Sequence, residues 1–448
     1  MESLEGEAGD FTVALREKPR YVDTGKCIAC GLCAEKCPRK VEDIFNQRLI
    51  QRKAVYVQYP QAVPLKYAID QANCIYFEKG KCRACEKFCP AGAVDFSQQE
   101  RTYRIHVGSV VLAAGAEPAD PSALLHYGYG TLPNVVTGMQ MERILSATGP
   151  YKGHLVRPSD GIPPERVAWI QCVGSRDSHP GAESYCSGVC CMYAVKEATI
   201  AKEHAGKDLD AAIFFMDMRT HGKGFERYRR RAEDKLGVRF IRSRVHSVVP
   251  AGGGSNDLQV AYADESGTVI EEKFQMVVLS QGFRVSSDVK ALAERLGIKM
   301  DPDGFIGTGC LSPVETSRRG VFVCGCTSNP MDIPQSVTEA SAAASACASL
   351  LAESRNTMIQ QKHYPPEAPV SAADVRIGVF VCHCGINIGG VVDVPKVRDY
   401  AGKLPGVVYA ADNLFSCSQD TQKVIRDAVA EHNLNRVVVA ACTPRTHE

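Results

Sequence analysis

The order of apolar and polar residues predicts a protein that mixes helices and strands. Residues 10–22 (DFTVALREKPRYV) alternate between apolar and polar side chains before a proline, which predicts a strand with no visible partner upstream. Residues 103–118 (YRIHVGSVVLAAGAEP) predict two further strands, the second of them buried, ending at a glycine turn. Residues 23–100, between these strands, form a small cysteine-dense module.

From residue 165 onward, predicted strands and helices alternate. Strands are predicted by RVAWIQCVG, DAAIFFMDM and VRFIRSRVHSVVP, and helices by VCCMYAVKEATIAKEHA and FERYRRRAEDKLG between them. This order is typical of an α/β domain with a parallel sheet. A hairpin (LQVAYAD, TVIEEKFQMVVLSQG) follows, and a strand at 320–326 then leads into an alanine-rich helix at 336–354. A polar stretch at 360–374 predicts a linker, and a further βα pair begins at residue 376.

Composition narrows the function classes. The 448 residues carry 52 basic and 51 acidic side chains, a net charge of +1, so no overall field attracts nucleic acid or an anionic membrane. No apolar run approaches the roughly 18 residues that a spanning helix needs, and the amino terminus (MESLEGEAGDF) is acidic, unlike a secretory signal. We therefore expect a cytoplasmic protein without a membrane span and without a nucleic-acid partner.

Cysteine is the residue that departs most from an ordinary composition. The chain has 20 cysteines, and most of them fall in four groups at 27–37, 74–89, 172–191 and 382–442. A long chain with no export signal has little use for so many disulfides in a reducing compartment. Metal binding or redox chemistry is the expected use.

The first two groups have the spacing of bacterial two-cluster ferredoxins. Cys27, Cys30, Cys33 and Cys37 are followed by Pro38, and a second run with a longer first gap is followed by Pro90. In such runs the fourth cysteine binds the other cluster. One predicted 4Fe–4S ligand set is therefore Cys27, Cys30, Cys33 and Cys89, and the other is Cys74, Cys82, Cys85 and Cys37. Two structural zinc sites are the alternative, but they would not explain the third step of each run or the two Cys-Pro endings.

The third group lies where an α/β sheet binds its ligands. Cys172 ends a predicted strand, and Cys186, Cys190 and Cys191 lie at the start of the next helix. A helix N-terminus favours thiolates, so these four cysteines could hold a third cluster. A redox disulfide with two packing cysteines explains the spacing equally well.

Taken together, these motifs resemble the A-subunit family of the heterodisulfide reductases, iron–sulfur flavoproteins of methanogens and related organisms. The resemblance covers nearly the whole chain. Its markers are, in family order, KPRYVDTGKCIACGLCAEKCP, VVLAAGAEP, CVGSRD with YCSGVCCMYAVKEA, RTHGKGFERYRRRA and GVFVCGCTSNPMDIPQSVTEASAAA.

The resemblance implies a thioredoxin-reductase-like FAD/NAD(P)-binding fold, incomplete at its amino terminus, with an inserted two-cluster ferredoxin module of the α+β class. The expected domains are a strand region at 1–19, the ferredoxin module at 20–100, an FAD/NAD(P)-binding-like domain at 101–359 with a cluster-binding subdomain at about 134–285, a linker at 360–375 and a partial α/β module at 376–448.

The same resemblance implies that Cys172, Cys186, Cys190 and Cys191 ligate a cluster. It also places FAD along six residues, with the N–H groups of the helix near Pro334 aimed at the flavin; the six are Ala114, Gly115, Gly325, Ile333, Pro334 and Val337. The family's opening GxGxxG fingerprint is absent, which counts against FAD in this chain. A glycine turn before an alanine-rich helix is also common in ordinary packing.

Residues 376–448 resemble the family's amino-terminal module, although they lie at the carboxyl end and stop within a fold. We expect a piece of a longer tandem polypeptide or of a split gene. Cys382, Cys384, Cys417 and Cys442 could ligate another cluster, but their spacing is irregular and packing explains it equally well.

Other residues have ordinary explanations. Packing is the favoured role of Cys310, Cys324, Cys326 and Cys347. The arginines at 227 and 229–231 could clamp a phosphate, but a solvated helix face is the better interpretation. A cluster is expected in place of NAD(P), because Cys172-Val173-Gly174 replaces the usual glycine fingerprint.

The leading functional hypothesis is an electron-transfer oxidoreductase subunit in which FAD and the clusters exchange electrons, with flavin-based bifurcation implied by the resemblance. Its expected partners are other redox subunits of such a complex, with a hydrogenase, a formate dehydrogenase or ferredoxin as candidates. The catalytic residues remain unknown. The alternatives are a flavin-free iron–sulfur relay and an NAD(P)H-linked reductase resembling the small subunit of glutamate synthase.

Overall fold

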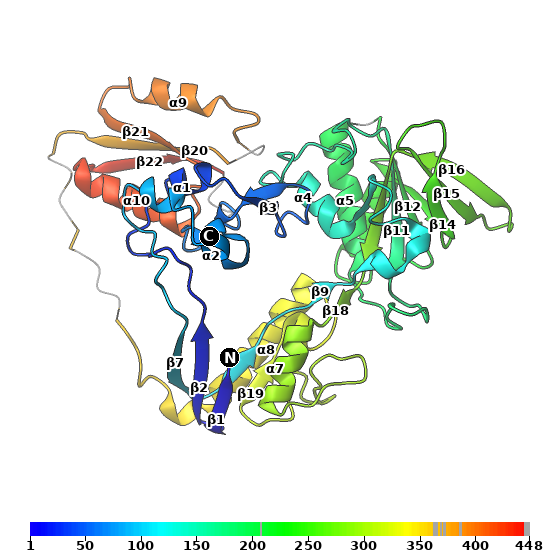
Figure 1. Cartoon of the computed structure of the whole chain (residues 1–448), viewed down its shortest axis with the longest axis horizontal. Coiled ribbons are helices and arrows are strands. Elements are labelled where there is room, and N and C mark those ends of the chain that lie inside the picture. Colours follow the sequence, from blue (N-terminus) through cyan, green and yellow to red (C-terminus); the bar gives the residue numbers. More distant parts are fainter. Residues whose placement is uncertain (207, 362–365, 368–369, 371–372, 385–387, 443–448) are drawn as a thin grey trace. The chain divides into compact units, whose positions relative to one another are not determined.

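The computed structural model describes residues 1–206, 208–361, 366–367, 370, 373–384 and 388–442. Contacts divide the chain into two compact units, each of which contains helices and strands (Figure 1). One unit comprises residues 1–18, 100–145 and 154–360, and the other comprises 19–99, 146–153 and 361–448. Half of the predicted linker at 360–375 lies outside the described residues. The predicted mixed α/β class is confirmed.

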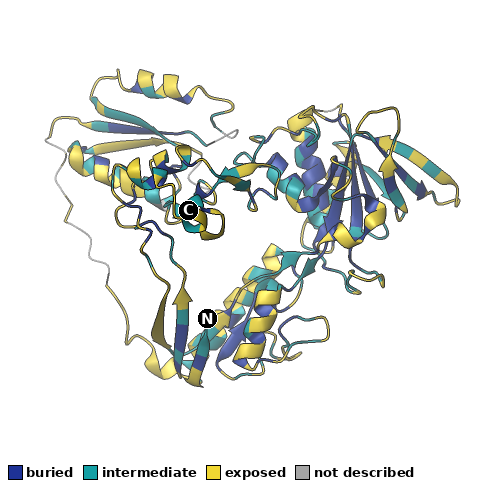
Figure 2. Ribbon diagram, viewed as in Figure 1, coloured by how far each residue is buried: buried dark blue, intermediate teal, exposed yellow. Residues whose placement is uncertain are grey.

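The centre of the first unit is a parallel sheet. Its strands run in the order β10 (Val135–Thr137), β17 (Met276–Gln281), β11 (Arg166–Val173), β12 (Asp210–Phe215) and β13 (Arg239–Arg242). Helices α4 (Gly138–Leu145), α5 (Cys190–Ala205) and α6 (Phe225–Asp234) accompany these strands. The central strands are buried along almost their whole length (Figure 2), which explains why they read as continuous apolar runs.

Two predicted strands of this region are each divided in the structure. Segment 238–250 forms β13 in the parallel sheet and β14 (Ser247–Pro250) in a second, antiparallel sheet, because a tight turn from Ser243 N to Ile241 O (3.0 Å) bends the chain. Segment 268–282 forms β16 (Val269–Phe274), which pairs with β15 (Leu258–Ala263), and then β17. At Gln275 the backbone N–H donates to Arg166 O (3.0 Å), and the chain passes there from the hairpin to the parallel sheet.

The prediction that the first strand lacks an upstream partner is wrong. β1 (Ser3–Glu7) pairs antiparallel with β2 (Asp10–Glu17), which in turn pairs with β7 (Arg101–Val107). β1 has the sequence SLEGE, whose single large apolar residue gives no alternation to recognise. Leu4, Phe11 and Val13 anchor this sheet on a core that includes helix α7 (Ser287–Leu296).

A small parallel pair lies in the same unit. β8 (Val110–Leu112) pairs with β19 (Val321–Val323), and helix α8 (Ile333–Leu350) follows. β9 (Glu117–Pro118) pairs with β18 (Phe283–Arg284). The carboxyl ends of β8 and β19 therefore lie side by side, as the strand order of an α/β ligand site requires.

The second unit contains the cysteine-dense module and the last α/β module. The former has three short helices, α1 (Leu32–Glu35), α2 (Ile75–Lys79) and α3 (Ala84–Lys87), and two short strand pairs, β3 (Lys40–Glu42) with β4 (Gln51–Lys53) and β5 (Val55–Tyr56) with β6 (Ala68–Ile69). The latter is a parallel sheet in the order β21 (Val407–Asn413), β20 (Ile377–Cys382) and β22 (Arg436–Ala440), with α9 (Val394–Ala401) and α10 (Gln419–Glu431). All five residues of β22 are exposed.

Candidate metal centres

Four cysteines from two distant parts of the sequence line one pocket of the ferredoxin-like module. They are Cys27, Cys30 and Cys33 from the first run and Cys89, the last cysteine of the second. Cys33 lies on α1, which begins after Gly31 in the left-handed conformation (φ +83°). The remaining wall is mainly apolar, with Val22, Ala93 and Val94 and the ring of Tyr67. The chain thus turns tightly enough to present several thiols to one enclosed space.

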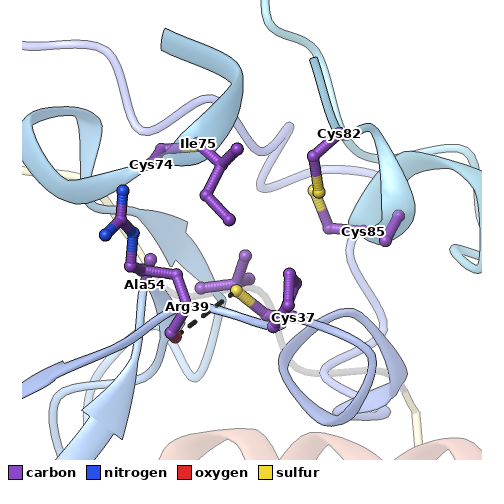
Figure 3. A pocket seen from close by; sticks show the side chains of 10 residues that line it. Cys37, Arg39, Ala54, Cys74, Ile75, Cys82 and Cys85 are labelled. Atoms are coloured by element: carbon purple, nitrogen blue, oxygen red, sulfur yellow. Dashed lines mark hydrogen bonds between the residues drawn. The ribbon is translucent and has the colours of Figure 1, made fainter. Parts of the chain in front are cut away.

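The other four cysteines line a second pocket. Cys74, Cys82 and Cys85 come from the second run, and Cys37 comes from the first. The side chains of Cys82 and Cys85 point toward each other, and Cys37, whose Sγ contacts Arg39 O, lines the same pocket (Figure 3). Cys82 has a left-handed backbone (φ +76°), a strained conformation for a residue with a side chain that concentrates at functional sites. The structure therefore brings together the same two crossed sets of four that the Cys-Pro spacing predicts.

The spacing of the thiols bears on which metal group the two pockets can hold. Among the described residues, no three His, Cys, Asp or Glu side chains approach closely enough to hold one metal ion. A structural zinc ion gathers four ligands at about 2.0–2.3 Å. The thiolates of a 4Fe–4S cube bind different irons and are spread around it. Two enclosed sets of four cysteines thus fit the chemistry of the cube better than that of zinc.

The thiols in these pockets are costly to ionise without a metal. Burial, aided by the neighbouring Cys27 and Cys89, raises the pKa of Cys33 to about 11. Burial, together with the charge of Cys74, raises the pKa of Cys85 to about 12. A cationic metal group reverses this cost, because ligation releases the protons.

Two lysines that the sequence analysis did not select accompany the pockets. Lys66 Nζ donates to the carbonyl of Cys27 and Lys53 Nζ to the carbonyl of Cys37, both at 2.6 Å. Each ammonium fixes the backbone of one cysteine run and places positive charge near a site for anionic thiolates. Nothing in the local sequence distinguishes these lysines from surface lysines.

The third cysteine group is brought together at the carboxyl end of β11. Cys190 and Cys191 begin α5 and are buried, whereas Cys172 and Cys186 are half-buried. Cys172 has a left-handed backbone (φ +59°) at a register shift between Ile170 and Val173. This irregularity displaces Cys172 from the regular ladder, and pairing resumes at Val173 with Gln281.

The four thiols of this group influence one another's ionisation. Burial raises the pKa of Cys190, and the other three cysteines raise it further. Burial raises the pKa of Cys191 to about 11, although the backbone near Arg219 lowers it. Burial also raises the pKa of Cys172, and the Arg176 guanidinium, which pairs with Asp217, opposes that rise. Thiols that influence one another's pKa at a helix N-terminus can bind a cationic metal group and can also form a disulfide.

The cysteines of the last module are not all gathered. Cys382 ends β20 and is buried, and its neighbour Cys384 is close enough that burial and Cys382 together raise the pKa of Cys384. Cys417 and Cys442 are exposed, before α10 and after β22. The structure shows one close pair here and no enclosed set of four among the described residues.

The predicted flavin residues lie around the carboxyl ends of β8 and β19. Gly115 has φ +75° with open space beside its Cα, and its N–H donates to Thr327 Oγ1 at 2.7 Å. Gly325 donates its N–H to Glu339 Oε2 at 3.0 Å. Ile333 and Val337 on α8 expose apolar side chains. Two turns, open space and apolar side chains fit the edge of a flat cofactor.

The prediction that the helix directs free N–H groups at a flavin is not supported at Gln335. Asp332 caps α8, accepting from Gln335 N at 2.8 Å, while the Gln335 side chain accepts from Asp332 N at 3.2 Å. Pro334 has no N–H, and Ser336 N donates to Asp332 O at 2.9 Å. The helix dipole remains, but the cap engages these donors of the first turn.

The arginine run and the remaining cysteines have structural surroundings. Arg229 pairs with Glu226 and Glu233, and Arg230 with Glu226, which fits the predicted solvated helix face of α6. Cys324 packs with Phe322 and Ala343, close to Cys347. Cys310 is exposed and Cys326 is half-buried.

Comparison with known proteins gives two kinds of match. A family described as "4Fe-4S binding domain" matches residues 20–41. The chain is 40% identical over 348 residues to the iron–sulfur A-subunit of CoB–CoM heterodisulfide reductase from Methanocaldococcus jannaschii, covering 77% of this chain and 52% of that protein. It is 37% identical over 387 residues to the A-subunit of the H2:CoB-CoM heterodisulfide, ferredoxin reductase from Methanothermobacter marburgensis, covering 85% of this chain and 56% of that protein.

The chain spans about half the length of these relatives. Solved structures similar to it include thioredoxin reductases of Lactococcus lactis (17% identity, TM-score 0.37, 67% of this chain and 86% of that one) and of T. acidophilum (15%, 0.36, 72% and 88%). Within the described residues, no helix has the length and apolar character needed to cross a bilayer. The resemblance to the heterodisulfide reductase A-subunit family is confirmed.

Proposed function

We propose that this chain, a relative of the heterodisulfide reductase A-subunits over 77 to 85% of its length, is an iron–sulfur electron-transfer component of a flavin-containing oxidoreductase. The observation that carries the proposal is the crossed gathering of eight cysteines into two pockets. The match of residues 20–41 to a 4Fe–4S binding domain supports it independently.

We assign twelve cysteines as cluster ligands: Cys27, Cys30, Cys33 and Cys89 in one set, Cys37, Cys74, Cys82 and Cys85 in the second, and Cys172, Cys186, Cys190 and Cys191 in the third. A bound 4Fe–4S cluster supplies one-electron transfer at each site. The chain contributes thiolates and apolar walls, and the ammonium groups of Lys53 and Lys66 lie beside the first two sets. Cys382, Cys384, Cys417 and Cys442 are not assigned, because only the first two lie close together.

We further propose that FAD binds along Ala114, Gly115, Gly325, Ile333, Pro334 and Val337. Open space at Gly115 and the apolar side chains of Ile333 and Val337 support this placement. A bound flavin would supply the exchange between two-electron and one-electron chemistry, which bifurcation also requires. In this arrangement the two glycine turns admit the cofactor edge, and Asp332 fixes the start of α8.

The partners we propose are other redox subunits of a heterodisulfide-reductase-like complex. Relatives carry names that include H2, formate, F420H2 and ferredoxin, so a hydrogenase, a formate dehydrogenase and ferredoxin are the candidate electron donors or acceptors. A cytoplasmic location is part of the same proposal.

A flavin-free relay is the second candidate. It is favoured by the capping of α8, because Asp332 already occupies backbone donors that an anionic cofactor group would otherwise use. In that case the chain would pass electrons between partner subunits through its clusters alone.

Electron paramagnetic resonance of the anaerobically purified chain, reduced with dithionite, tests the proposal. We expect overlapping signals of reduced 4Fe–4S clusters, and the variants Cys33→Ala, Cys85→Ala and Cys190→Ala should each remove a different component and about four irons. Cys310→Ala, at an exposed cysteine outside the three sets, is the control and should change nothing. Loss of no component in any of the three variants would contradict the assignment.

A further inference from the structure

Helix α5 carries a carboxyl group in an unfavourable place. Glu197 is completely buried, and so are Ala194, Ala198 and Ala201 around it on the helix. Burying an ionised carboxylate in such apolar surroundings costs a large amount of free energy, unless a cation or several hydrogen-bond donors compensate the charge. Glu197 therefore needs either such compensation or a proton.

The contacts of Glu197 point to a proton. Trp169 Nε1 on β11 donates to Glu197 Oε2 at 2.9 Å. The second oxygen, Oε1, has no hydrogen-bond donor among the described residues. Among titratable groups, the carboxyl of Glu142 on α4 has the largest effect on the pKa of Glu197. Two carboxyl groups that face each other are stable when they share a proton.

Charge and burial agree with this arrangement. Burial first, and then the negative charge of Glu142, raise the pKa of Glu197 well above its usual value, while Trp169 and Lys196 oppose the rise. The charged and titratable groups that bear on it are Glu142 from α4 and Lys196 and Tyr193 from α5 itself. The strands β11 and β17 contribute the neutral Trp169 and, beside Tyr193, Ser280.

The carboxyl pair connects water to the third cysteine group. Glu142 keeps a third of its side chain exposed and pairs with Lys196 Nζ at 2.6 Å. On the inner side, Tyr193 lies one turn before Glu197 and donates its hydroxyl to Gln281 O at 2.7 Å. The same carbonyl accepts a hydrogen bond from Cys190 Sγ at 3.3 Å. Polar side chains thus follow one another from the surface at Glu142, past the buried Glu197 and Tyr193 one turn away, toward a cysteine of the group.

We propose that Glu142 and Glu197 form a proton-loading pair that couples a change of charge at the four-cysteine site to proton uptake from water. The pair holds one shared proton while that site is oxidised. When a one-electron reductant adds an electron there, the Glu142 carboxylate takes a proton from solvent and becomes a carboxylic acid, so the added charge is balanced. No bond to the site forms or breaks. This inference depends on the third cluster proposed above.

A potentiometric titration followed by electron paramagnetic resonance, repeated across pH, tests the coupling. In the anaerobically purified full chain, we expect the midpoint potential of the component that Cys190→Ala removes to fall by about 59 mV for each tenfold drop in proton concentration. Glu197→Gln keeps the shape and an acceptor for Trp169 but cannot share a proton, and its potential should not depend on pH. Glu142→Gln should behave in the same way.

The matched control is Glu203→Gln, at the exposed end of α5, which should keep the wild-type slope. A merely structural role for Glu197 would lower the iron content or shift the potential equally at every pH. Retention of the wild-type slope in Glu197→Gln, or a wild-type potential that does not depend on pH, would refute the coupling while the cluster stands. A chain that binds only about eight irons would refute the third cluster itself, and the coupling with it.

Discussion

Cys37 and Cys89 are the two residues that change sets if each cysteine run binds its own cluster rather than sharing its last cysteine with the other. Cys37 belongs to the first run in sequence, but in the structure it lines the pocket of Cys74, Cys82 and Cys85. Its Sγ lies 3.8 Å from Arg39 O, and Arg39 lines the same pocket.

We predict that Cys37→Ala reproduces the magnetic resonance spectrum of Cys85→Ala, because both remove a ligand of the same cluster. Cys89→Ala should reproduce the spectrum of Cys33→Ala for the same reason. The measurement compares the four spectra after dithionite reduction. The crossed assignment is wrong if Cys37→Ala instead matches Cys33→Ala.

Glu197 gives a prediction that needs no metal. Its raised pKa means that the folded chain binds a proton that the unfolded chain, with a glutamate pKa of about 4.3, has released at neutral pH. The contribution of Glu197 to stability is therefore fully present below its unfolded pKa and falls as the pH rises toward its folded pKa, by up to about 1.4 kcal/mol per pH unit. Urea unfolding at about pH 6 and about pH 8 should show this loss in wild type and not in Glu197→Gln.

The matched Glu203→Gln variant should lose stability with pH as wild type does. Equal pH dependence in wild type and Glu197→Gln would show that Glu197 is ionised in the folded chain.

Single functional residues could be predicted from the sequence where the chemistry fixes the spacing between them. The eight ferredoxin cysteines are recognisable because tight turns impose fixed gaps between ligands of one cube. Glu197 was not recognisable, since a glutamate in the segment VKEA looks like a surface residue. Its burial depends on Trp169 and Glu142, which the fold brings from 28 residues away on β11 and from another helix.

Among the elements, the hairpin of β1 and β2 depends on Gly6. Both Gly6 and Gly9 have left-handed backbones, at φ +89° and +100°. A Cβ on Gly6 would lie 2.3 Å from the carbonyl oxygen of Asp10, whereas a Cβ on Gly9 would meet nothing within 4 Å.

We predict that Gly6→Ala destabilises the hairpin by at least about 1 kcal/mol more than Gly9→Ala, because only the former adds a clash to the backbone strain. Hydrogen exchange of the β1 and β2 amides measures the difference. Equal protection in the two variants would contradict the pairing at Gly6.

The edge of the parallel sheet depends on a cluster of opposite charges. Glu272 on β16 accepts from Arg239 Nη2 at 2.7 Å and from the Tyr262 hydroxyl at 3.1 Å, and it also pairs with Arg166. Its side chain is 16% exposed, whereas the arginines are 37% exposed, so solvent screens part of the attraction.

We expect Glu272→Gln to lower the free energy of unfolding by about 1 to 2 kcal/mol. Glu271→Gln, at the exposed neighbouring residue, should change it by less than about 0.5 kcal/mol. Urea unfolding followed by the fluorescence of Trp169 reports directly on the adjacent β11. Equal losses in the two variants would show that the ion pairs do not stabilise the sheet.

Helices and strands were predicted correctly where the apolar runs are long. They were predicted wrongly where two strands share one apolar run or where a strand has no apolar run. The parallel strands β11 and β12 and helix α5 follow directly from their patterns, since burial on both faces demands continuous apolar residues. Segment 268–282 reads as one strand, and its division at Gln275 is imposed by pairing with Arg166 from another part of the chain. The acidic strand β1 gives no pattern at all.

On the scale of the whole molecule, the two compact units divide the chemistry. The ferredoxin cysteines lie in one unit, and the third cysteine group and the proposed flavin residues lie in the other. An oxidoreductase that links two-electron donors to one-electron carriers needs both kinds of site, and the chain contains candidate residues for each. Its spacing motifs predicted the first well, whereas the flavin site rests on glycine turns that occur in many folds.

The most direct measurement of the central claim is the count of iron, acid-labile sulfide, zinc and flavin in the chain purified without oxygen. Three 4Fe–4S clusters require about twelve irons and about twelve sulfides per chain, and the flavin site adds one FAD. About eight irons and about eight sulfides without flavin would indicate a two-cluster relay. Two zinc ions with negligible sulfide would contradict the account.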